Sequence, residues 1–523
     1  ALELIRESIK VNQLAGEGST QTIIENDIIV PDVKPDIARI LNIDADVYVG
    51  KTEVGNGKIT ASGVINYKIL YVSDDEIRSV KGITTSCDFS EDLHISEARQ
   101  GMNAKLKCDI EHIDYELANS RKLNAKVVLK FSTKIMDEKE LDLVTDISGV
   151  ENLQVLRSQS LVNCFIENNE AEYSVAESFE IPFGKPSIKE ILRNDIKLSG
   201  KEYQVTDNKL LIRGELNIST LYIGDDEERS IQSLEYDIPF SQVMELPEEN
   251  SSLVCDVDYK ITDAGLEVAE DNDGEPRVLN YQAVVKLTVS EYAKREVEIL
   301  EDAYSPRSSL NIDKEPFEII DVTADEKTQI SLRDSVLFDI TAPEVKEIFN
   351  VTSRVSLTDY SVYNGKVIVE GVVDSNILYL SSSSDQPLLS RLQETPFRQT
   401  IDVAGVKEGM KCDIDLDIHN SSCNLIAPDE VELRVVIDVG VKTLNKMVLP
   451  EVVKVDEVPL DEKRLASRPS ITIYFTQEGD TLWKVAKRYL TTIDDIRKIN
   501  NIDEDKEIIP GQQLIIPRKS LPA

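Results

Sequence analysis

Histidine and cysteine are scarce in this 523-residue chain, and their scarcity limits the chemistry that it can perform. The three histidines, His94, His112 and His419, lie far apart in the sequence. Nucleophilic triads and most zinc sites depend on histidine, so neither has support here. No Cys-x-x-Cys pair occurs, which argues against a disulfide framework and a clustered zinc site. The six cysteines are Cys87, Cys108, Cys164, Cys255, Cys412 and Cys423. We therefore predict a protein that is not an enzyme, with no catalytic residues, no metal and no cofactor.

Basic residues and long apolar runs are also in short supply. Lys and Arg total 58 against 96 Asp and Glu, which gives a net charge of −38. A charge of this sign repels phosphate backbones and anionic membranes, so we predict no nucleic-acid binding and no direct membrane insertion. Apolar runs are as short as Val127–Leu129, whereas a membrane-spanning helix needs roughly 18 apolar residues. The first residues are unlike a signal peptide, so we expect a soluble protein that stays inside the cell.

One unit of about 150 residues occurs three times along the chain. Its clearest marker is a proline followed by an apolar stretch, at Pro35, Pro186 and Pro343, with offsets of 186 − 35 = 151 and 343 − 186 = 157. The same offsets align Asn56–Gly57 with Asp207–Asn208 and Asn364–Gly365, Gly63 with Gly214 and Gly371, and Tyr71 with Tyr222 and Tyr379. A period this long exceeds that of solenoid repeats, so each copy is expected to be a domain in its own right.

Each copy is predicted to be mainly β. In the first copy, apolar residues alternate with polar ones from Ile59 to Tyr71, which is the pattern of a long half-buried strand. Asn56–Gly57 just before it favours a tight hairpin turn. After the marker proline, the apolar spacing of Ile37, Ile40 and Leu41 predicts one short helix in each copy. The expected fold is therefore a β-sandwich with a short helix, present three times.

The C-terminal segment has a different pattern. Residues 459–470 form a polar stretch bracketed by prolines, which predicts a linker. Tyr474–Tyr489 (YFTQEGDTLWKVAKRY) and Ile509–Pro517 (IPGQQLIIP) resemble the LysM domain at nearly every signature position. Asp480 is predicted to cap a helix whose apolar stripe begins at Leu482. We expect a small α+β domain with the order strand, helix, helix, strand.

The repeated unit also resembles a known family. Val30–Leu41 (VPDVKPDIARIL) and Ile69–Asp75 (ILYVSDD) are similar to the SPOCS domain found in spore-forming anaerobes. The predicted organisation is three SPOCS-like domains, a linker and a LysM domain, at residues 1–150, 151–313, 314–458, 459–470 and 471–518. This order resembles that of spore coat morphogenetic proteins. The resemblance implies a coat-assembly factor in the mother-cell cytoplasm at the forespore surface, and in the spore coat. It further implies that the LysM domain binds the coat ATPase, stage IV sporulation protein A (SpoIVA).

Two loops of the LysM segment match the positions that form a sugar groove in relatives. The predicted groove residues are Gly479, Asp480, Thr481 and Leu482 in one loop, and Ile508, Ile509 and Pro510 in the other. Trp483, the only Trp in the chain, stands next to the apolar stripe and is expected to be half exposed. It would then either shield the small core or anchor a protein partner. Lys484 and Lys487 on the same helix would contribute charge-assisted contacts.

Two functions remain open at this point. The first is a scaffold, in which the SPOCS-like domains hold a surface for coat proteins and the LysM domain binds SpoIVA. The second is a carbohydrate-binding protein whose LysM domain recognises the N-acetylglucosamine polymers of peptidoglycan. The recurring cysteines Cys108, Cys255 and Cys412 lie in strand-like segments, so they are predicted to be core residues rather than a redox or metal site.

Overall fold

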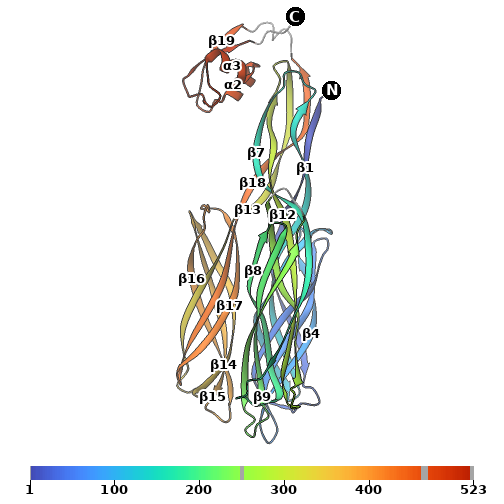
Figure 1. Ribbon diagram of the computed structural model, residues 1–523, viewed down its shortest axis with the longest axis vertical. Coiled ribbons are helices and arrows are strands. Elements are labelled where there is room, and N and C mark those ends of the chain that lie inside the picture. The colour runs from blue at the N-terminus through green and yellow to red at the C-terminus, as the bar shows by residue number, and fades with distance from the viewer. Residues whose placement is uncertain (1, 248–251, 461–468, 519–523) are drawn as a thin grey trace.

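The computed structural model describes residues 2–247, 252–460 and 469–518 (Figure 1). Three β-sheet bodies lie side by side at one end of an elongated molecule, and long strands continue from them as a narrow stalk. The C-terminal unit, residues 469–518, lies at the far end of that stalk. Each body is one copy of the repeat, so the mainly β prediction is confirmed. Of the predicted linker, residues 461–468 lie outside the described residues.

The six strands of each copy follow the same order along the chain. Copy 1 contains β1 (Glu3–Ile29), β2 (Ile37–Val54), β3 (Lys58–Ser73), β4 (Val80–His94), β5 (Asn103–Asn119) and β6 (Lys122–Ser148). Copy 2 contains β7 (Gln154–Glu180), β8 (Ile188–Thr206), β9 (Lys209–Gly224), β10 (Ile231–Glu245), β11 (Ser252–Glu270) and β12 (Pro276–Tyr304). Copy 3 contains β13 (Ser308–Leu337), β14 (Val345–Tyr363), β15 (Lys366–Ser381), β16 (Leu388–Asp402), β17 (Lys411–Ala427) and β18 (Glu430–Pro459). The C-terminal unit contains β19 (Ile471–Phe475), α2 (Leu482–Tyr489), α3 (Ile493–Asn500) and β20 (Gln513–Pro517).

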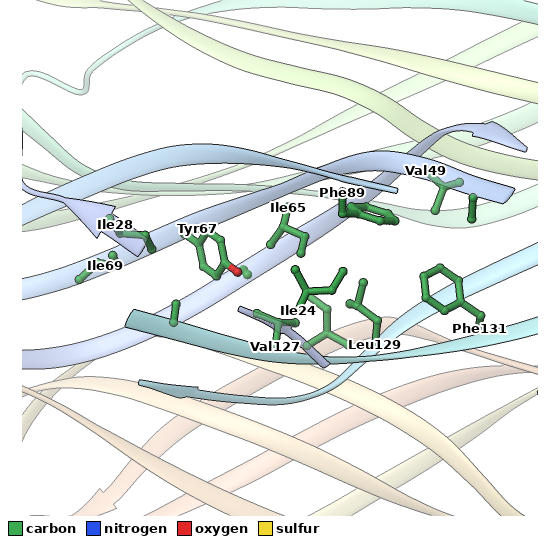
Figure 2. Close-up of a cluster of buried hydrophobic side chains, with 14 of the residues drawn as sticks. Ile24, Ile28, Val49, Ile65, Tyr67, Ile69, Phe89, Val127, Leu129 and Phe131 are labelled. Atoms are coloured by element: carbon green, nitrogen blue, oxygen red, sulfur yellow. The ribbon is translucent and has the colours of Figure 1, made fainter. Parts of the chain in front are cut away.

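Every copy is a sandwich of two three-stranded antiparallel sheets. In copy 1 the strand orders are β1-β6-β5 and β2-β3-β4, and copies 2 and 3 repeat both orders with their own strands. Apolar side chains from the two sheets meet between them, as Figure 2 shows for Ile65 and Tyr67 of β3 and Val127 and Leu129 of β6. Copies 2 and 3 each enclose a cluster of the same kind. Alternation along the strands thus supplies one buried face per sheet.

The short helix predicted after each marker proline is wrong, because these residues begin β2, β8 and β14. The pairing of β2 with β3 shifts between Ile37 and Arg39 and again between Ile40 and Asn42, and β8 and β14 show shifts at the equivalent places. Such β-bulges add a residue to the strand and interrupt its alternation. Ile37 and Ile40 are therefore both buried although they lie three residues apart, a spacing that imitates a helical turn.

The stalk is built jointly by the three copies. The first and last strands of each copy have 27 to 30 residues and extend beyond the other four strands. Their outer ends enclose a shared apolar cluster, in which Val11, Val162 and Ile319 occupy equivalent positions of the three copies. The boundary predicted at 313 falls inside β13, because the chain reverses at residues 305–307 instead. The copies thus have separate sandwich cores, and all three contribute to this stalk cluster and to two further apolar clusters, one around Leu192 and one around Leu300.

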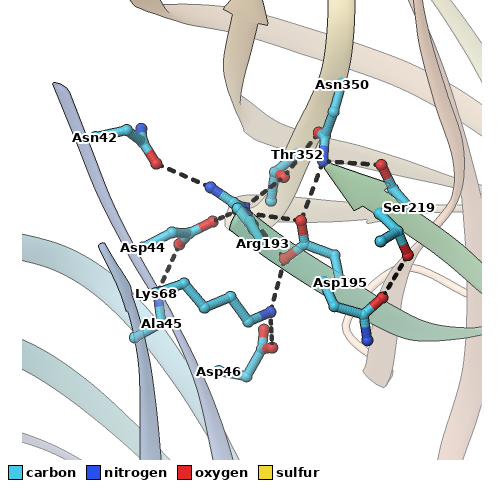
Figure 3. A network of polar contacts seen from close by, with 12 residues as sticks. Asn42, Asp44, Ala45, Asp46, Lys68, Arg193, Asp195, Ser219, Asn350 and Thr352 are labelled. Carbon is cyan, nitrogen blue, oxygen red and sulfur yellow. Dashed lines mark hydrogen bonds and ion pairs between the residues drawn. The ribbon is translucent and has the colours of Figure 1, made fainter. Parts of the chain in front are cut away.

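A buried polar network also joins the copies (Figure 3). Its centre is Arg193 of β8, whose side chain is 3 % exposed. Arg193 Nη1 donates to Asn42 Oδ1, Nη2 donates to Asp44 Oδ2, and Nε donates to Asp195 Oδ2, each at 2.8 Å. Asn42 and Arg193 occupy the same position in copies 1 and 2, and Asn350 occupies it in copy 3, where its amide donates to Asp195 at 3.1 Å.

Each buried carboxylate of this network faces a cation from another copy. Lys68 of copy 1 donates to Asp195 of copy 2 at 2.6 Å, and Arg354 of copy 3 donates to Asp44 of copy 1 at 2.5 Å. Burial by itself would raise the pKa of Asp44, but Arg354, Arg193 and Lys68 outweigh it and hold that pKa far below its ordinary value. Both carboxylates are therefore charged at neutral pH, and their pairing depends on how the copies are placed.

Candidate functional site

The C-terminal unit has the predicted order of strand, helix, helix and strand. β19 pairs antiparallel with β20, and the two helices pack against them around a core that includes Val485 and Ile496. The predicted cap of α2 is wrong by one residue, because the side chain of Thr481 accepts the hydrogen bond from Lys484 N. Asp480 instead accepts hydrogen bonds from Gln477 N at 2.8 Å and from the Tyr474 hydroxyl at 2.5 Å, which stabilise the preceding loop.

The two predicted groove loops lie side by side because Thr476 connects them. Thr476 is buried at the end of β19, and its hydroxyl donates to Ile509 O at 2.5 Å and accepts from Gln512 N at 2.9 Å. Gly511 N donates to Thr476 O at 2.7 Å. Gly479 and Gly511 both have φ of 82°, the left-handed region that favours glycine. The sequence therefore needs glycine at these positions to bring the loops into this arrangement.

The remaining predicted groove residues differ in exposure. Gly479, Thr481 and Pro510 are exposed, Ile508 is half-buried against the core, and Leu482 is buried. Ile509 is 67 % exposed. Lys484 is exposed, and its Nζ donates to Gly479 O at 2.8 Å, so it supports the first loop. The surface open to a ligand thus comes mainly from Thr481, Ile509 and Pro510.

Trp483 and Lys487 extend from α2 onto the end of the stalk. Trp483 is 9 % exposed, so the prediction of a half-exposed Trp is wrong. Its Nε1 donates to Asp302 Oδ2 at 2.8 Å, and its ring meets that of Tyr304 edge-on, with 4.9 Å between centroids. Lys487 Nζ donates to Oδ1 and Oδ2 of Asp302 at 2.6 and 2.7 Å. The Tyr304 hydroxyl donates to Thr491 O at 2.7 Å, so this face of α2 is covered by the chain itself.

Asp302 is charged in this contact. Burial by itself would raise its pKa, but the hydrogen bonds from Lys487 and Trp483 outweigh burial and hold the pKa below its ordinary value. Sequence reasoning missed Asp302 and Tyr304, because they precede the LysM segment by about 170 residues and carry no local motif. It also missed Thr476, although the alternation of β19 places Thr476 on the same side as the core residue Tyr474.

The recurring cysteines lie at the sandwich cores rather than together. Cys255 and Cys412 are buried in copies 2 and 3, and Cys108 is half-buried against the core of copy 1. Burial raises the pKa of Cys108 and of Cys255 to about 12, so these thiols are protonated at neutral pH. The structure supports the core-packing prediction. Over the described part of the chain, no group of three or more His, Cys, Asp or Glu could hold a metal ion.

Comparison with known families agrees with this architecture. A family model described as the SipL SPOCS domain matches residues 36–118, 187–269 and 344–426, and a LysM domain model matches residues 474–517. The chain has the SipL domain architecture. Each SPOCS match covers the second to fifth strands of one copy, so the stalk-forming first and last strands lie outside it. No curated protein and no solved structure matches the chain.

The SipL architecture connects this protein with sporulation and the spore coat, and its LysM domain is a peptidoglycan-type binding domain. SPOCS and LysM domains are binding or scaffold modules rather than catalytic ones. Within residues 2–247, 252–460 and 469–518, no helix has the length and apolar character needed to span a bilayer. The candidate site therefore has two surfaces, the open groove loops and the covered face of α2.

Proposed function

We propose that this protein is a non-enzymatic scaffold for spore coat assembly, at work in the mother-cell cytoplasm at the forespore surface and then in the spore coat. Its LysM domain binds the coat ATPase SpoIVA, and its SPOCS domains bind other coat proteins. The observation that carries the proposal is the position of the LysM domain at one end of a rod whose other end is formed by three SPOCS domains (Figure 1). A rod of this form holds two sets of partners at a fixed spacing.

The SPOCS end of the rod presents three large apolar side chains. Val33, Phe183 and Ile340 are 92 %, 101 % and 98 % exposed. Each lies in the turn between the first and second strands of its copy, at the end of the sandwich away from the stalk. A single exposed apolar residue is ordinary, but its presence in the same turn of all three copies is a repeated feature. These side chains support contact with other proteins at this end.

In copies 1 and 2, side-chain hydrogen bonds hold these turns in place without a bound partner. Arg121 Nη2 donates to the carbonyls of Val30 and Pro31, both at 3.1 Å, and Arg277 makes the equivalent pair of hydrogen bonds in copy 2. A preorganised turn loses little conformational entropy on binding. The nine strand-connecting turns at this end contain sixteen acidic and five basic residues, a net charge of −11. Partners with basic surfaces are therefore favoured.

The proposal is tested with the purified full chain against purified SpoIVA and against insoluble peptidoglycan. We expect binding to SpoIVA that is lost when residues 471–523 are deleted. A triple variant with Val33→Ser, Phe183→Ser and Ile340→Ser should keep SpoIVA binding but retain fewer coat proteins on the spore. The scaffold proposal would be contradicted if the chain sediments with peptidoglycan and does not bind SpoIVA.

The second candidate function is recognition of N-acetylglucosamine polymers, and the exposed groove loops favour it. Thr481, Ile509 and Pro510 remain accessible while α2 is covered by the stalk. If this function is correct, peptidoglycan binding should be competed by N-acetylglucosamine oligomers and weakened by Ile509→Ala. Ile499→Ala, a matched change at an isoleucine of α3 that is 40 % exposed, should have no effect.

A further inference from the structure

Trp483 and Lys487 form one face of α2, here named the α2 face, and this face contacts another surface of the same chain. That surface is the stalk end, where Asp302 supplies a carboxylate and Tyr304 supplies an aromatic ring. We infer that the α2 face is the protein-binding surface of the LysM domain, that the stalk end masks it in the free chain, and that its partner presents a carboxylate beside an aromatic ring. This inference rests on the proposed function, and it specifies the surface and the chemistry of the partner.

The chemistry of the α2 face explains this specificity. The indole N–H of Trp483 is a donor only, and the Lys487 ammonium has three donors and no acceptor. A carboxylate satisfies both at once, as Asp302 does with three hydrogen bonds of 2.6 to 2.8 Å. A neutral acceptor would leave the charge of Lys487, whose side chain is partly exposed, without an opposite charge beside it. The edge-on contact with Tyr304 then favours an aromatic ring next to the carboxylate.

Masking has a measurable consequence for binding. On the stalk side, the side chains of Asp302 and Tyr304 make the hydrogen bonds of this contact. These two residues lie two positions apart on β12, so their part of the contact is confined to a short stretch of one strand. A partner that needs the α2 face can bind only the fraction of molecules in which this contact is open, and its apparent affinity falls by that fraction. Breaking the contact should therefore strengthen binding of such a partner. Ligands of the groove loops should be unaffected, because those loops are already exposed.

The solvent access of Trp483 reports on masking directly, because it is the only Trp in the chain. We compare acrylamide quenching of its fluorescence in the full-length wild type, Asp302→Ala and Tyr304→Ala. Glu298→Ala is the matched control, because it removes an exposed carboxylate from the same strand. We expect quenching to increase at least about twofold, with a red-shifted emission, in the first two variants and not in the control. Circular dichroism and the thermal midpoint exclude unfolding as the cause. Equal quenching in all four proteins would overturn the inference.

Affinity measurements separate this inference from the proposed function. We expect Asp302→Ala to bind SpoIVA at least about threefold more tightly than the wild type and the control, with binding to insoluble peptidoglycan unchanged. If quenching rises but the affinity for SpoIVA stays the same, the α2 face is not the partner surface and the inference fails while the scaffold proposal stands. If SpoIVA binds none of the proteins, the proposed function fails, and the assignment of a protein partner to the α2 face fails with it.

Discussion

Arg193→Ala should be among the most destabilising single substitutions in the chain. Arg193 is 3 % exposed and compensates two buried carboxylates, Asp44 and Asp195, from two different copies. Removing one partner of a buried ion pair costs about 3–5 kcal/mol, because the other charge stays buried without compensation. In the variant, Asp44 would still pair with Arg354 and Asp195 with Lys68. The expected loss in free energy of unfolding therefore lies near the lower end of this range, at about 3 kcal/mol.

The assay is urea unfolding followed by far-UV circular dichroism, with the free energy of the first transition compared between variants. Arg398→Ala is the control, because Arg398 pairs with Glu370 on the surface and its side chain is 67 % exposed. An exposed pair of this kind contributes less than about 1 kcal/mol. Arg193→Lys should lie between the two, since lysine keeps the charge but loses the fork of donors. The reasoning is refuted if Arg193→Ala costs no more than Arg398→Ala.

The loss in free energy of unfolding caused by Arg193→Ala should also depend on pH. In the wild type the pKa of Asp44 lies far below its ordinary value of 3.8. The stabilisation that the ion pairs of Asp44 give the folded state is therefore complete above about pH 4, and it is lost as the pH falls through the lower pKa of the folded state. In the variant, burial without Arg193 raises the pKa of both carboxylates, so they take up protons at a higher pH. The difference in free energy of unfolding between variant and wild type should therefore be largest near neutral pH and should narrow below about pH 5. A constant difference between pH 7 and pH 4 would contradict this explanation.

Three further predictions concern separate parts of the molecule. Cys255 and Cys412 should react slowly with thiol reagents in buffer and fully in denaturant, and rapid native labelling would argue for a redox or metal role. Trp483→Ala should weaken binding of the LysM domain to SpoIVA at least tenfold, about 1.4 kcal/mol, and circular dichroism of the same variant should show the domain still folded. The fragment 1–150 should be soluble with β-type circular dichroism, because copy 1 has its own core, but it should unfold at lower temperature than the full chain because it lacks the shared stalk cluster. A random-coil spectrum would show that copy 1 is not an independent domain.

The amino-acid sequence by itself determined the order of domains and the kind of fold. Near-constant offsets between the prolines, glycines and tyrosines of the three copies reveal the repeat, because each copy needs the same turns and the same buried positions. Alternation from Ile59 to Tyr71 identifies a long strand, and the LysM motif identifies two strands and two helices. All of these signals are local, since each arises within one strand, one turn or one small domain.

Predictions from local sequence patterns were wrong where pairing with another strand or hydrogen bonds from nearby residues changed the local structure. The spacing of Ile37 and Ile40 imitates a helix because two β-bulges interrupt the alternation of β2. Bulges depend on pairing with β3, so the residues of β2 alone cannot distinguish the two structures. Asp480 and Thr481 are both good capping residues, and the choice between them depended on Asp480 receiving hydrogen bonds from Tyr474 and Gln477.

Only the tertiary structure decided how the parts of the molecule are joined. Arg193 stands where the other two copies have asparagine, and as a sequence position it is simply one charge among many in an acidic chain. Its role depends on Asp44, 149 residues away, just as the burial of Trp483 depends on Asp302, 181 residues away. The sequence shows which side chains can donate and accept, but the partner of each is set by the placement of whole domains. That placement depends on the shared stalk core and on the contact between the stalk end and the LysM domain, to which distant strands contribute together.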